Sequence, residues 1–317
     1  MGLRKAARWL LVIPKTEWIW MNGDFVKWDD AKVHVLAHSL HYGSGIFEGI
    51  RCYNTPKGPA IFRLHDHMKR LEDSAKIHKI KMPYSGKELA DATIELVRLN
   101  KLKECYIRPL VFYGFGEMKL SPLNCPVETI IAAFPFGTYL GKEALEKGVR
   151  CKVSSWIRIT ANILPPQAKC SANYANSILA HREAVDAGCD EAIMLDHKGN
   201  ISEGPGENVF IVRDNTLLTP PLESDILRGI TRHSLIIIAR DLGIRVIERH
   251  IPRDEIYVAD EAFFSGTAAE ITPITEVDGR IVGDGKRGPI TKKLQSVFFN
   301  VVRGKVPKYK NWLTPVK

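Results

Sequence analysis

Residues 169–208 read KCSANYANSILAHREAVDAGCDEAIMLDHKGNISEGPGEN and guide the interpretation of the whole chain. Lys169 precedes a run with helical composition, a short apolar strand follows, and a glycine-rich loop then carries Glu203 and Glu207. One helix and one strand folded back on each other bring Lys169 and Glu203 to the same cleft. An amine nucleophile and a carboxylate in one cleft are the pair that Schiff-base chemistry requires.

Predicted strands and helices are mixed on both sides of this stretch. Alternating or β-branched runs predict strands at 18–28, as a hairpin about Asn22-Gly23, and at 106–114, 127–135, 149–156 and 209–219. Apolar stripes at helical spacing predict helices at 63–79, 229–243 and 289–302. A further helix is predicted directly after the capping pair Ser85 and Glu88. The sequence has neither a strict β-α-β rhythm nor a G-x-G-x-x-G loop, so we predict an α+β fold rather than a doubly wound sheet.

The length of the chain predicts two domains, since 317 residues can bury two hydrophobic cores. The predicted strands stop near residue 139, where a charged helix-like run begins. We therefore expect a smaller domain of residues 1–138, with a short N-terminal extension over residues 1–15, and a larger domain of residues 139–317.

The net charge of +9 makes nucleic acids and acidic small molecules the two partner classes to consider. Basic residues alternate with acidic ones, as in MKRLEDSAKIHKIK at 68–81, whereas nucleic-acid binding needs a localised basic patch. We therefore predict no nucleic-acid partner. A cleft for acidic substrates or phosphate uses the positive charge equally well.

The cysteines and apolar segments indicate a cytoplasmic protein. The six cysteines show no C-x-x-C or other metal-ligand spacing, so reduced thiols are the simplest interpretation. The apolar part of the N-terminus, 9–13, ends at Pro14, and no later run approaches the roughly 20 apolar residues of a membrane span. His34, His38 and His41 lack carboxylate partners at ligand spacing, so we predict no metal site.

Lys169 and the polar residues after it are the first candidates for catalysis. Few charged residues surround Lys169, so its amine can become a nucleophile if it is desolvated. Tyr174 can donate to an anionic phenolate oxygen, and a carboxylate such as Glu203 facing a pyridine nitrogen keeps that nitrogen protonated. A solvated loop lysine, a packed tyrosine and a turn with solvated acids are the alternatives.

Three segments can bind an anion. Residues 229–231 open a predicted helix, whose first amides and dipole attract negative charge. The SGTAAE segment at 265–270 follows a strand and offers further backbone donors, and Arg63 lies at a strand-to-helix junction. A capping role for Thr231 and a surface position for Arg63 are the alternatives.

Taken together, these residues occur in motifs that resemble the branched-chain amino acid aminotransferases of fold type IV, which use pyridoxal 5′-phosphate (PLP). The resemblance extends from about Trp18 to Trp312 and rests on HYGSGIFEGIR, FRLHDHMKRL, YIRPL, KCSANY, ISEGPGENVF, GITR and SGTAAEITP, in the family's order and spacing. It implies a two-domain α+β fold like that of D-amino acid aminotransferase. It also implies at least a homodimer, in which the small domain helps to cover the partner's site.

The resemblance assigns roles to individual residues. Lys169 corresponds to the lysine that forms the Schiff base and moves the proton, Glu203 to the partner of the pyridine nitrogen, and Tyr174 to the donor to the ring's O3′. The residues that correspond to the phosphate cradle are Arg63, Ile230, Thr231, Gly266 and Thr267. The residues that correspond to the substrate pocket are Tyr42, Phe47, Tyr106, Arg108, Met118, Phe136, Tyr139, Thr267 and Ala268.

Within that pocket, the resemblance implies two ways of binding a carboxylate. The amides of Thr267 and Ala268 and the hydroxyl of Tyr106 would hold the α-carboxylate. Arg108, helped by two tyrosines, would receive the side-chain carboxylate of glutamate, while apolar walls accept leucine, isoleucine or valine. Phe136 stands where several relatives have tryptophan, which changes the size of the pocket.

These assignments predict PLP-dependent transamination between L-branched-chain amino acids and 2-oxoglutarate, which gives branched 2-oxo acids and L-glutamate. A D-amino acid transaminase and an aminodeoxychorismate lyase share the fold and are the first alternatives. The Tyr106-Ile107-Arg108 segment argues against the D-specific pattern. A basic binding protein without catalytic activity is the second alternative.

Overall fold

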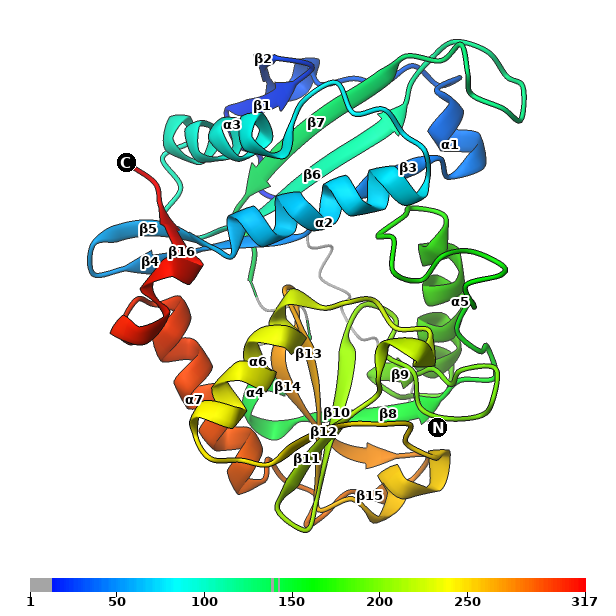
Figure 1. Cartoon of the computed structure of the whole chain (residues 1–317), viewed down its shortest axis with the longest axis vertical. Helices are drawn as coiled ribbons and strands as arrows, with labels where there is room; N and C mark the ends of the chain where they lie inside the picture. Colours follow the sequence, from blue (N-terminus) through cyan, green and yellow to red (C-terminus); the bar gives the residue numbers. More distant parts are fainter. Residues whose placement is uncertain (1–12, 138–139, 142) are drawn as a thin grey trace, which may run out of the picture.

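The computed structural model describes residues 13–137, 140–141 and 143–317, and within them two eight-stranded sheets lie one above the other (Figure 1). The first sheet has the order β16-β5-β4-β6-β7-β1-β2, with β3 paired to β6, and its strands run antiparallel. Its strands are β1 (Trp18–Met21), β2 (Asp24–Lys27), β3 (Gly45–Phe47), β4 (Ile50–Thr55), β5 (Gly58–Phe62), β6 (Cys105–Tyr113), β7 (Val127–Phe134) and β16 (Leu313–Pro315).

The second sheet has the order β12-β11-β10-β13-β14-β8-β9, with β15 paired to β14. The pairs β11–β12, β14–β8 and β8–β9 are parallel and the others antiparallel. Its strands are β8 (Val149–Val153), β9 (Glu191–Ile193), β10 (Asn208–Arg213), β11 (Thr216–Thr219), β12 (Val246–Glu248), β13 (Glu261–Gly266), β14 (Glu270–Val277) and β15 (Arg280–Ile281). This mixed sheet agrees with the predicted α+β class rather than with a doubly wound sheet.

The helices cover the faces of the two sheets. In Figure 1, α2 and α3 lie against the first sheet, while α6 and α7 lie against the second. The α-helices are α1 (His38–Tyr42), α2 (Leu64–Ile77), α3 (Gly86–Leu99), α4 (Ala144–Lys147), α5 (Asn173–Asp186), α6 (Ile230–Asp241) and α7 (Pro289–Val302). Short 3₁₀ helices are η1 (Trp28–Asp30), η2 (Leu222–Ser224), η3 (Arg253–Val258) and η4 (Pro307–Trp312).

Local sequence signals explain several of these elements. Asn22 and Gly23 both have positive φ, 53° and 106°, as the two-residue turn of the predicted hairpin requires. Ser85 caps α3 through a complete capping box with Glu88, also as predicted. Pro289, the first residue of α7, has the fixed φ that suits a helix start.

The C-terminal segment connects the two sheets. Phe298 on α7 packs against Phe62 on β5, with ring centroids 5.7 Å apart, and Trp312 packs against the same Phe62 ring at 6.0 Å. Strand β16 then pairs with β5, so the chain ends in the first sheet, at the left of Figure 1. The division into residues 1–138 and 139–317 stays a prediction.

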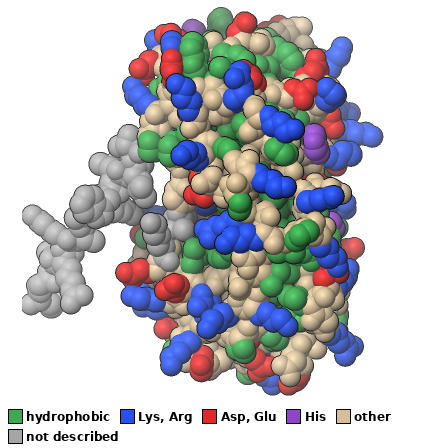
Figure 2. All heavy atoms as spheres, turned by 90° about the vertical axis from the view of Figure 1, so that its left-hand side faces the viewer, with side chains coloured by type: hydrophobic (Ala, Val, Ile, Leu, Met, Phe, Trp, Pro, Cys, Tyr) green, Lys and Arg blue, Asp and Glu red, His purple; other side chains and the backbone are tan. Residues whose placement is uncertain are grey.

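Two further findings concern the described residues as a whole. None of their helices is both long and apolar enough to cross a membrane, and none of their His, Cys, Asp and Glu side chains form a group of three or more that could hold a metal ion. On the face drawn in Figure 2, Lys and Arg side chains are interspersed with Asp and Glu side chains. Residues 1–12, most of the predicted N-terminal extension, lie outside the described residues.

Candidate active site

A cavity of about 220 Å³ lies between the two sheets and gathers most of the predicted site residues. It is lined from the first sheet, from the segments before and within α5, from the loop before β10, from the start of α6 and from the end of β13. The predicted residues that line it are Phe47, Tyr106, Arg108, Lys169, Tyr174, Glu203, Ile230, Thr231, Gly266, Thr267 and Ala268. Segments far apart in the sequence therefore meet at one site.

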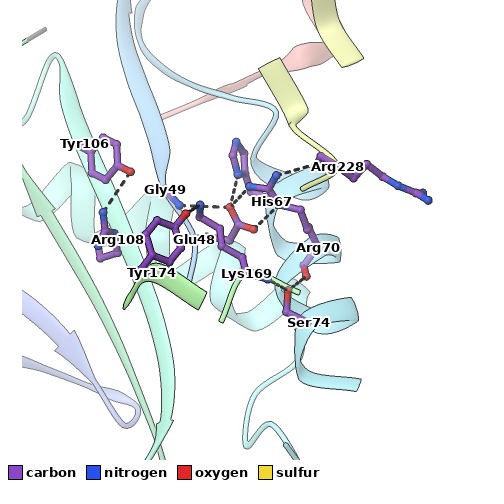
Figure 3. Close-up of polar contacts among 10 residues, drawn as sticks. All are labelled: Glu48, Gly49, His67, Arg70, Ser74, Tyr106, Arg108, Lys169, Tyr174 and Arg228. Atoms are coloured by element: carbon purple, nitrogen blue, oxygen red, sulfur yellow. Dashed lines mark hydrogen bonds and ion pairs between the residues drawn. The ribbon is translucent and has the colours of Figure 1, made fainter. Parts of the chain in front are cut away.

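Lys169 is fixed by its backbone between α2 and β3, which directs its side chain into the cavity (Figure 3). Its amide donates a hydrogen bond to Ser74 Oγ (3.0 Å), and its carbonyl accepts one from Phe47 N (3.0 Å). The amine Nζ donates to the Tyr174 hydroxyl at 2.5 Å and lies 4.9 Å from the centre of the Phe47 ring. An amine held in this way is placed for nucleophilic chemistry.

Glu203 is a buried carboxylate with partners on both oxygens. Oε1 lies 2.9 Å from Arg158 Nε, and Oε2 accepts hydrogen bonds from the Asn208 side chain and the Leu227 amide, both at 3.0 Å. Burial raises the pKa of the Glu203 carboxyl, while Arg158, the Leu227 amide and Lys169 oppose this shift. A further cation at this carboxylate, such as a protonated pyridine nitrogen, would favour its charged form.

Glu207, the second acid of the same loop, also lines the cavity and is buried. Its Oε2 accepts a hydrogen bond from the Gly206 amide (3.0 Å). Burial, together with the neighbouring carboxylate of Glu191, raises the pKa of Glu207 well above its ordinary value. Glu207 is therefore held toward its neutral form, and Glu203, with Arg158 beside it, is the better partner for a cation.

The N-terminus of α6 provides one half of an anion site. The first amides of a helix have no acceptor within the helix, and Ile230 and Thr231, the first two residues of α6, line the cavity. A Cβ on Gly229, the N-cap, would lie 1.9 Å from Asn208 Oδ1, so glycine permits this close approach. Thr231 is the second residue of the helix rather than its N-cap, so the alternative role of Thr231 as a helix cap is wrong.

The turn between β13 and β14 provides the other half. Arg51 on β4 donates to the carbonyls of Thr267 (Nε, 2.9 Å) and Ala268 (Nη2, 3.0 Å), and its charge is balanced by Glu270 at 3.7 Å. Because C=O and N–H of a trans peptide point in opposite directions, holding the Thr267 carbonyl turns the Ala268 amide away from Arg51. Both turn residues line the cavity, so Arg51 orients donors there without lining it.

Tyr106 and Arg108 reach the cavity from the same strand, β6 (Figure 3). Arg108 Nη2 lies 3.4 Å from the Tyr106 hydroxyl, and the guanidinium lies 4.8 Å from the centre of the Phe47 ring. A Cβ on Gly49 would lie 1.9 Å from that hydroxyl, so the missing side chain makes room for it. A hydroxyl and a guanidinium beside an aromatic wall can accept either a carboxylate or an apolar group.

Arg63 and Phe136 are predicted site residues that do not line the cavity. Arg63 is buried against α6, where Nη1 donates to Ser234 Oγ (3.0 Å). Phe136 packs behind Tyr106, with ring centroids 4.9 Å apart. Tyr139 lies outside the described residues. The roles assigned to these three residues stay predictions.

Tyr42 and Met118 also lie away from the cavity. Tyr42 is on α1 and Met118 on the loop between β6 and β7, and they are 41% and 42% exposed. The Tyr42 hydroxyl donates to the Met118 carbonyl (3.3 Å), so the two segments contact each other. The predicted contact of Tyr42 and Met118 with substrate would therefore require α1 and the β6–β7 loop to lie at the cavity of a second copy of the chain.

Several residues around the cavity were not predicted from the sequence. Arg158 and Asn208 hold Glu203, Arg51 holds the Thr267 turn, and Arg70 lines the cavity. Their partners lie on other elements, so no local spacing points to them. One usable signal exists nearby, because Glu48 is a charged residue within the apolar run GIFEGI.

Comparison with known proteins finds one family. Residues 45–277 match the model of amino-transferase class IV. The branched-chain-amino-acid aminotransferase of Pseudomonas aeruginosa is 50% identical over 94% of this chain and 97% of its own length. The enzyme of the same name from Escherichia coli K12 is 50% identical over 95% of this chain and 98% of its own length.

Solved structures agree with the sequence relatives. The crystal structure of the E. coli branched-chain amino acid aminotransferase has a TM-score of 0.94 and 49% identity, covering 96% of this chain and 100% of that chain. The branched-chain amino acid aminotransferase from Thermobaculum terrenum in its PLP form has a TM-score of 0.90 and 39% identity, covering 96% of this chain and 99% of that chain. The predicted family resemblance and fold class are therefore confirmed.

Proposed function

The chain belongs to the class IV aminotransferases, and we propose that it exchanges amino groups between L-branched-chain amino acids and 2-oxoglutarate, with PLP as the cofactor. Leucine, isoleucine and valine would give branched 2-oxo acids, and 2-oxoglutarate would give L-glutamate. Relatives at 50% identity are named for branched-chain amino acids, which favours these donors over the D-amino acids of the alternative prediction.

The observation that carries this proposal is the meeting of Lys169, Tyr174 and Glu203 in one cavity with the N-terminus of α6. This donor set fits PLP. Lys169 would supply the amine for its aldehyde, Glu203 a carboxylate for its ring nitrogen, and the N-terminus of α6 donors for its phosphate. A Cβ on Gly229 would collide with Asn208 Oδ1, so glycine at the N-cap lets the start of α6 lie against Asn208, whose side-chain amide holds Glu203. When bound, PLP supplies an electron-withdrawing ring that stabilises negative charge on the substrate Cα.

Lys169 would serve first as the nucleophile and then as the carrier of the proton. When it is not bonded to the cofactor, Lys169 Nζ would accept and hold the proton from the substrate Cα and would return it toward the cofactor's C4′. Tyr174, 2.5 Å from Nζ, holds the amine beside the reacting atoms and would donate to the ring's O3′. Glu203 would remain charged opposite the ring nitrogen, with Arg158 supporting that charge.

The substrate would be held at its α-carboxylate and selected by its side chain. The amides of Thr267 and Ala268 and the Tyr106 hydroxyl would bind the α-carboxylate shared by all substrates. Arg108 would bind the second carboxylate of glutamate or 2-oxoglutarate, and the Phe47 ring beside it would contact an aliphatic side chain. One pocket can then serve both half-reactions.

A second copy of the chain is proposed to complete this pocket. Tyr42 and Met118 belong to a surface on α1 and the β6–β7 loop that is rich in exposed apolar side chains. The most exposed of these side chains are Val35 (73%), Leu40 (65%), Leu120 (82%) and Leu123 (88%). Such a surface is typical of one buried by association. We propose at least a homodimer in which Tyr42 and Met118 reach the partner's cavity.

The cysteines bear on the compartment. All six are free, and five of them are buried. Free thiols persist where the surroundings are reducing, so we propose a cytoplasmic location.

The half-reactions of the PLP-loaded protein test the proposed function. Addition of L-leucine is expected to change the visible absorbance of the cofactor and release 4-methyl-2-oxopentanoate, and 2-oxoglutarate is expected to restore the spectrum. D-leucine is the matched arm and should react far more slowly. A faster reaction with D-leucine would favour the D-specific alternative, and a protein inert to both would contradict the proposal.

A further inference from the structure

Glu48 is a fully buried carboxylate that does not line the cavity, although Phe47 and Gly49 on either side of it do. It accepts hydrogen bonds on both oxygens from Arg70, Nε to Oε1 at 2.7 Å and Nη2 to Oε2 at 2.8 Å. The His67 ring also lies 2.7 Å from Oε2. Figure 3 shows this cluster beside Lys169. Glu48 therefore stands directly behind the cavity wall, facing α2.

The pKa shifts in this cluster favour a charged Glu48 and a neutral His67. Burial alone would raise the pKa of Glu48, but Arg70 and His67 lower it below its ordinary value. Burial lowers the pKa of His67, against the attraction of Glu48, so His67 is favoured as a neutral donor. Glu48 and Arg70 thus form a two-pronged ion pair, which fixes the direction of the guanidinium plane.

Arg70 also binds the segment that precedes α6, the helix that lies against the second sheet. Its Nη1 donates to the Arg228 carbonyl at 2.9 Å, while the Arg228 side chain points away from the cluster (Figure 3). Arg228 directly precedes Gly229, the N-cap of α6, and the cavity is lined by Arg70 and by residues 229–231. One guanidinium therefore links a carboxylate behind the first sheet to the start of α6.

The same face of α2 also holds Lys169. Ser74, one turn after Arg70, donates to the Arg70 carbonyl (2.8 Å) and accepts from the Lys169 amide (3.0 Å). The helix therefore contacts both ends of the proposed cofactor site: Lys169 through Ser74, and the start of α6 through Arg70. The Lys169 contact uses a neutral hydroxyl, whereas the contact with α6 depends on the ion pair with Glu48.

Stability gives a weak reason for burying this ion pair. Removing two charges from water is costly, and well-packed apolar residues often replace such pairs without loss of stability. What an apolar pair cannot do is hold the Arg228 carbonyl in place. The pair lies between the cavity wall and the N-cap of α6. A role in the site therefore explains its presence better than a gain in stability does.

We infer that Glu48 is a positioning residue for the cofactor's phosphate group, acting through Arg70 to fix the Arg228 carbonyl and so the first turn of α6. The inference rests on the proposed placement of the phosphate at that turn. Glu48 does not touch the ligand. Loss of the link should weaken binding of the phosphate group and leave Lys169 and Glu203, which serve the aldehyde and the ring, in position.

Comparing PLP with pyridoxal, which lacks the phosphate, isolates this effect. The apo-protein is titrated with each compound, and the Kd is read from the visible absorbance. Arg70→Lys keeps a positive charge for Glu48 but cannot form three hydrogen bonds in one plane, and Glu48→Gln removes the charge that orients Arg70. Both should raise the Kd for PLP about tenfold or more, the size expected for one charge-assisted hydrogen bond, and leave that for pyridoxal unchanged.

Matched controls and stability measurements complete the experiment. Glu95→Gln and Arg98→Lys alter an exposed pair on α3 and should change neither Kd. If Glu48→Gln does not fold, as judged by its melting curve, Arg70→Lys decides, with Glu48→Asp as the variant that keeps both charges. An unchanged Kd for PLP in the folded variants, or equal losses for PLP and pyridoxal, would overturn the inference.

A Thr231→Ala variant separates failure of this inference from failure of the proposed site. One outcome is that Thr231→Ala raises the Kd for PLP but not for pyridoxal, while the Glu48 and Arg70 variants change neither Kd. In that case the placement of the phosphate is supported and the role of Glu48 is contradicted. If Thr231→Ala leaves the preference for PLP unchanged, the proposed placement of the phosphate fails and the inference falls with it.

Discussion

Lys169 Nζ donates a 2.5 Å hydrogen bond to the hydroxyl of Tyr174, a residue in the first turn of α5. The lysine backbone is held by hydrogen bonds with Ser74 and Phe47. The amine is therefore restrained at both ends of its side chain, with the backbone fixed by two elements and the nitrogen by a third. Such restraint limits the positions the nucleophile can take before it reacts.

Tyr174→Phe tests the value of this hydrogen bond. The ring should keep its packing against Phe47, whose centroid lies 4.9 Å away, so the fold should be retained. Loss of the hydroxyl should lower kcat about tenfold, because the amine and the ring oxygen both lose a partner. Steady-state kinetics with L-leucine measures the change. Tyr84→Phe, beside Trp20 and away from the cavity, is the control, and equal kcat values in the two variants would contradict the role of Tyr174.

Arg108→Met should separate the two substrate classes. The guanidinium is proposed to bind the second carboxylate of 2-oxoglutarate, whereas leucine carries no charge there. The KM for 2-oxoglutarate should therefore rise about tenfold or more, and the KM for leucine should change little. Kinetics with each substrate varied in turn checks the split. Similar rises in both KM values would show that Arg108 supports the site in general rather than the carboxylate.

Gly49→Ala should displace the Tyr106 hydroxyl, because the new Cβ would lie only 1.9 Å from it. If that hydroxyl helps to bind the α-carboxylate, both substrates carry the group, and the KM for each should rise about tenfold. Gly137→Ala is the matched control, since a Cβ at that position would have nothing within 4 Å. Unaltered KM values in Gly49→Ala would argue against the proposed role of Tyr106.

Glu207 predicts a dependence of stability on pH. Burial and Glu191 raise its pKa in the folded state. A carboxyl with a raised folded pKa contributes stability that is present below its unfolded pKa and lost as the pH rises through the folded pKa. Glu207→Gln keeps a neutral group and should remove this loss. Its Tm should exceed that of the wild type by roughly 2–4 °C at pH 9, the shift that about 1 kcal/mol produces, and by little at pH 5.

The charged groups that act on Glu207 include Glu191, Glu203 and Lys169. The control variant for Glu207→Gln should therefore lose one carboxylate elsewhere and leave all of these groups, and Glu207 itself, unchanged. Glu146→Gln alters an exposed acid on α4 and should follow the wild-type pH dependence. Thermal melting across this pH range measures all three proteins. A parallel pH dependence in wild type and Glu207→Gln would show that Glu207 titrates as an exposed acid.

Elements with local signals could be predicted from the sequence. Helix α7 spans Pro289–Val302, as predicted, because Pro289 marks its start and apolar residues at helical spacing continue through it. The Asn22-Gly23 turn fixes the β1–β2 hairpin in the same way, since both residues accept positive φ. Lys169 and Glu203 were also expected in one cleft, and the helix and strand between them do bring both to the cavity.

Contacts between distant elements could not be predicted in this way. Arg51 and the Thr267 carbonyl are separated by 216 positions, and Arg70 and the Arg228 carbonyl by 158. Each contact depends on how the two sheets face each other, and backbone carbonyls leave no mark in the sequence. Strand β16 is a similar case, because its pairing with β5 is decided by packing around Phe62 rather than by its own three residues.

Reduction with borohydride followed by peptide mapping tests the central claim most directly. PLP-loaded protein is reduced, digested and analysed by mass spectrometry for the lysine that carries the phosphopyridoxyl group. The group is predicted on Lys169, with loss of both the label and turnover in Lys169→Ala. A label on another lysine, or undiminished turnover in Lys169→Ala, would contradict the account.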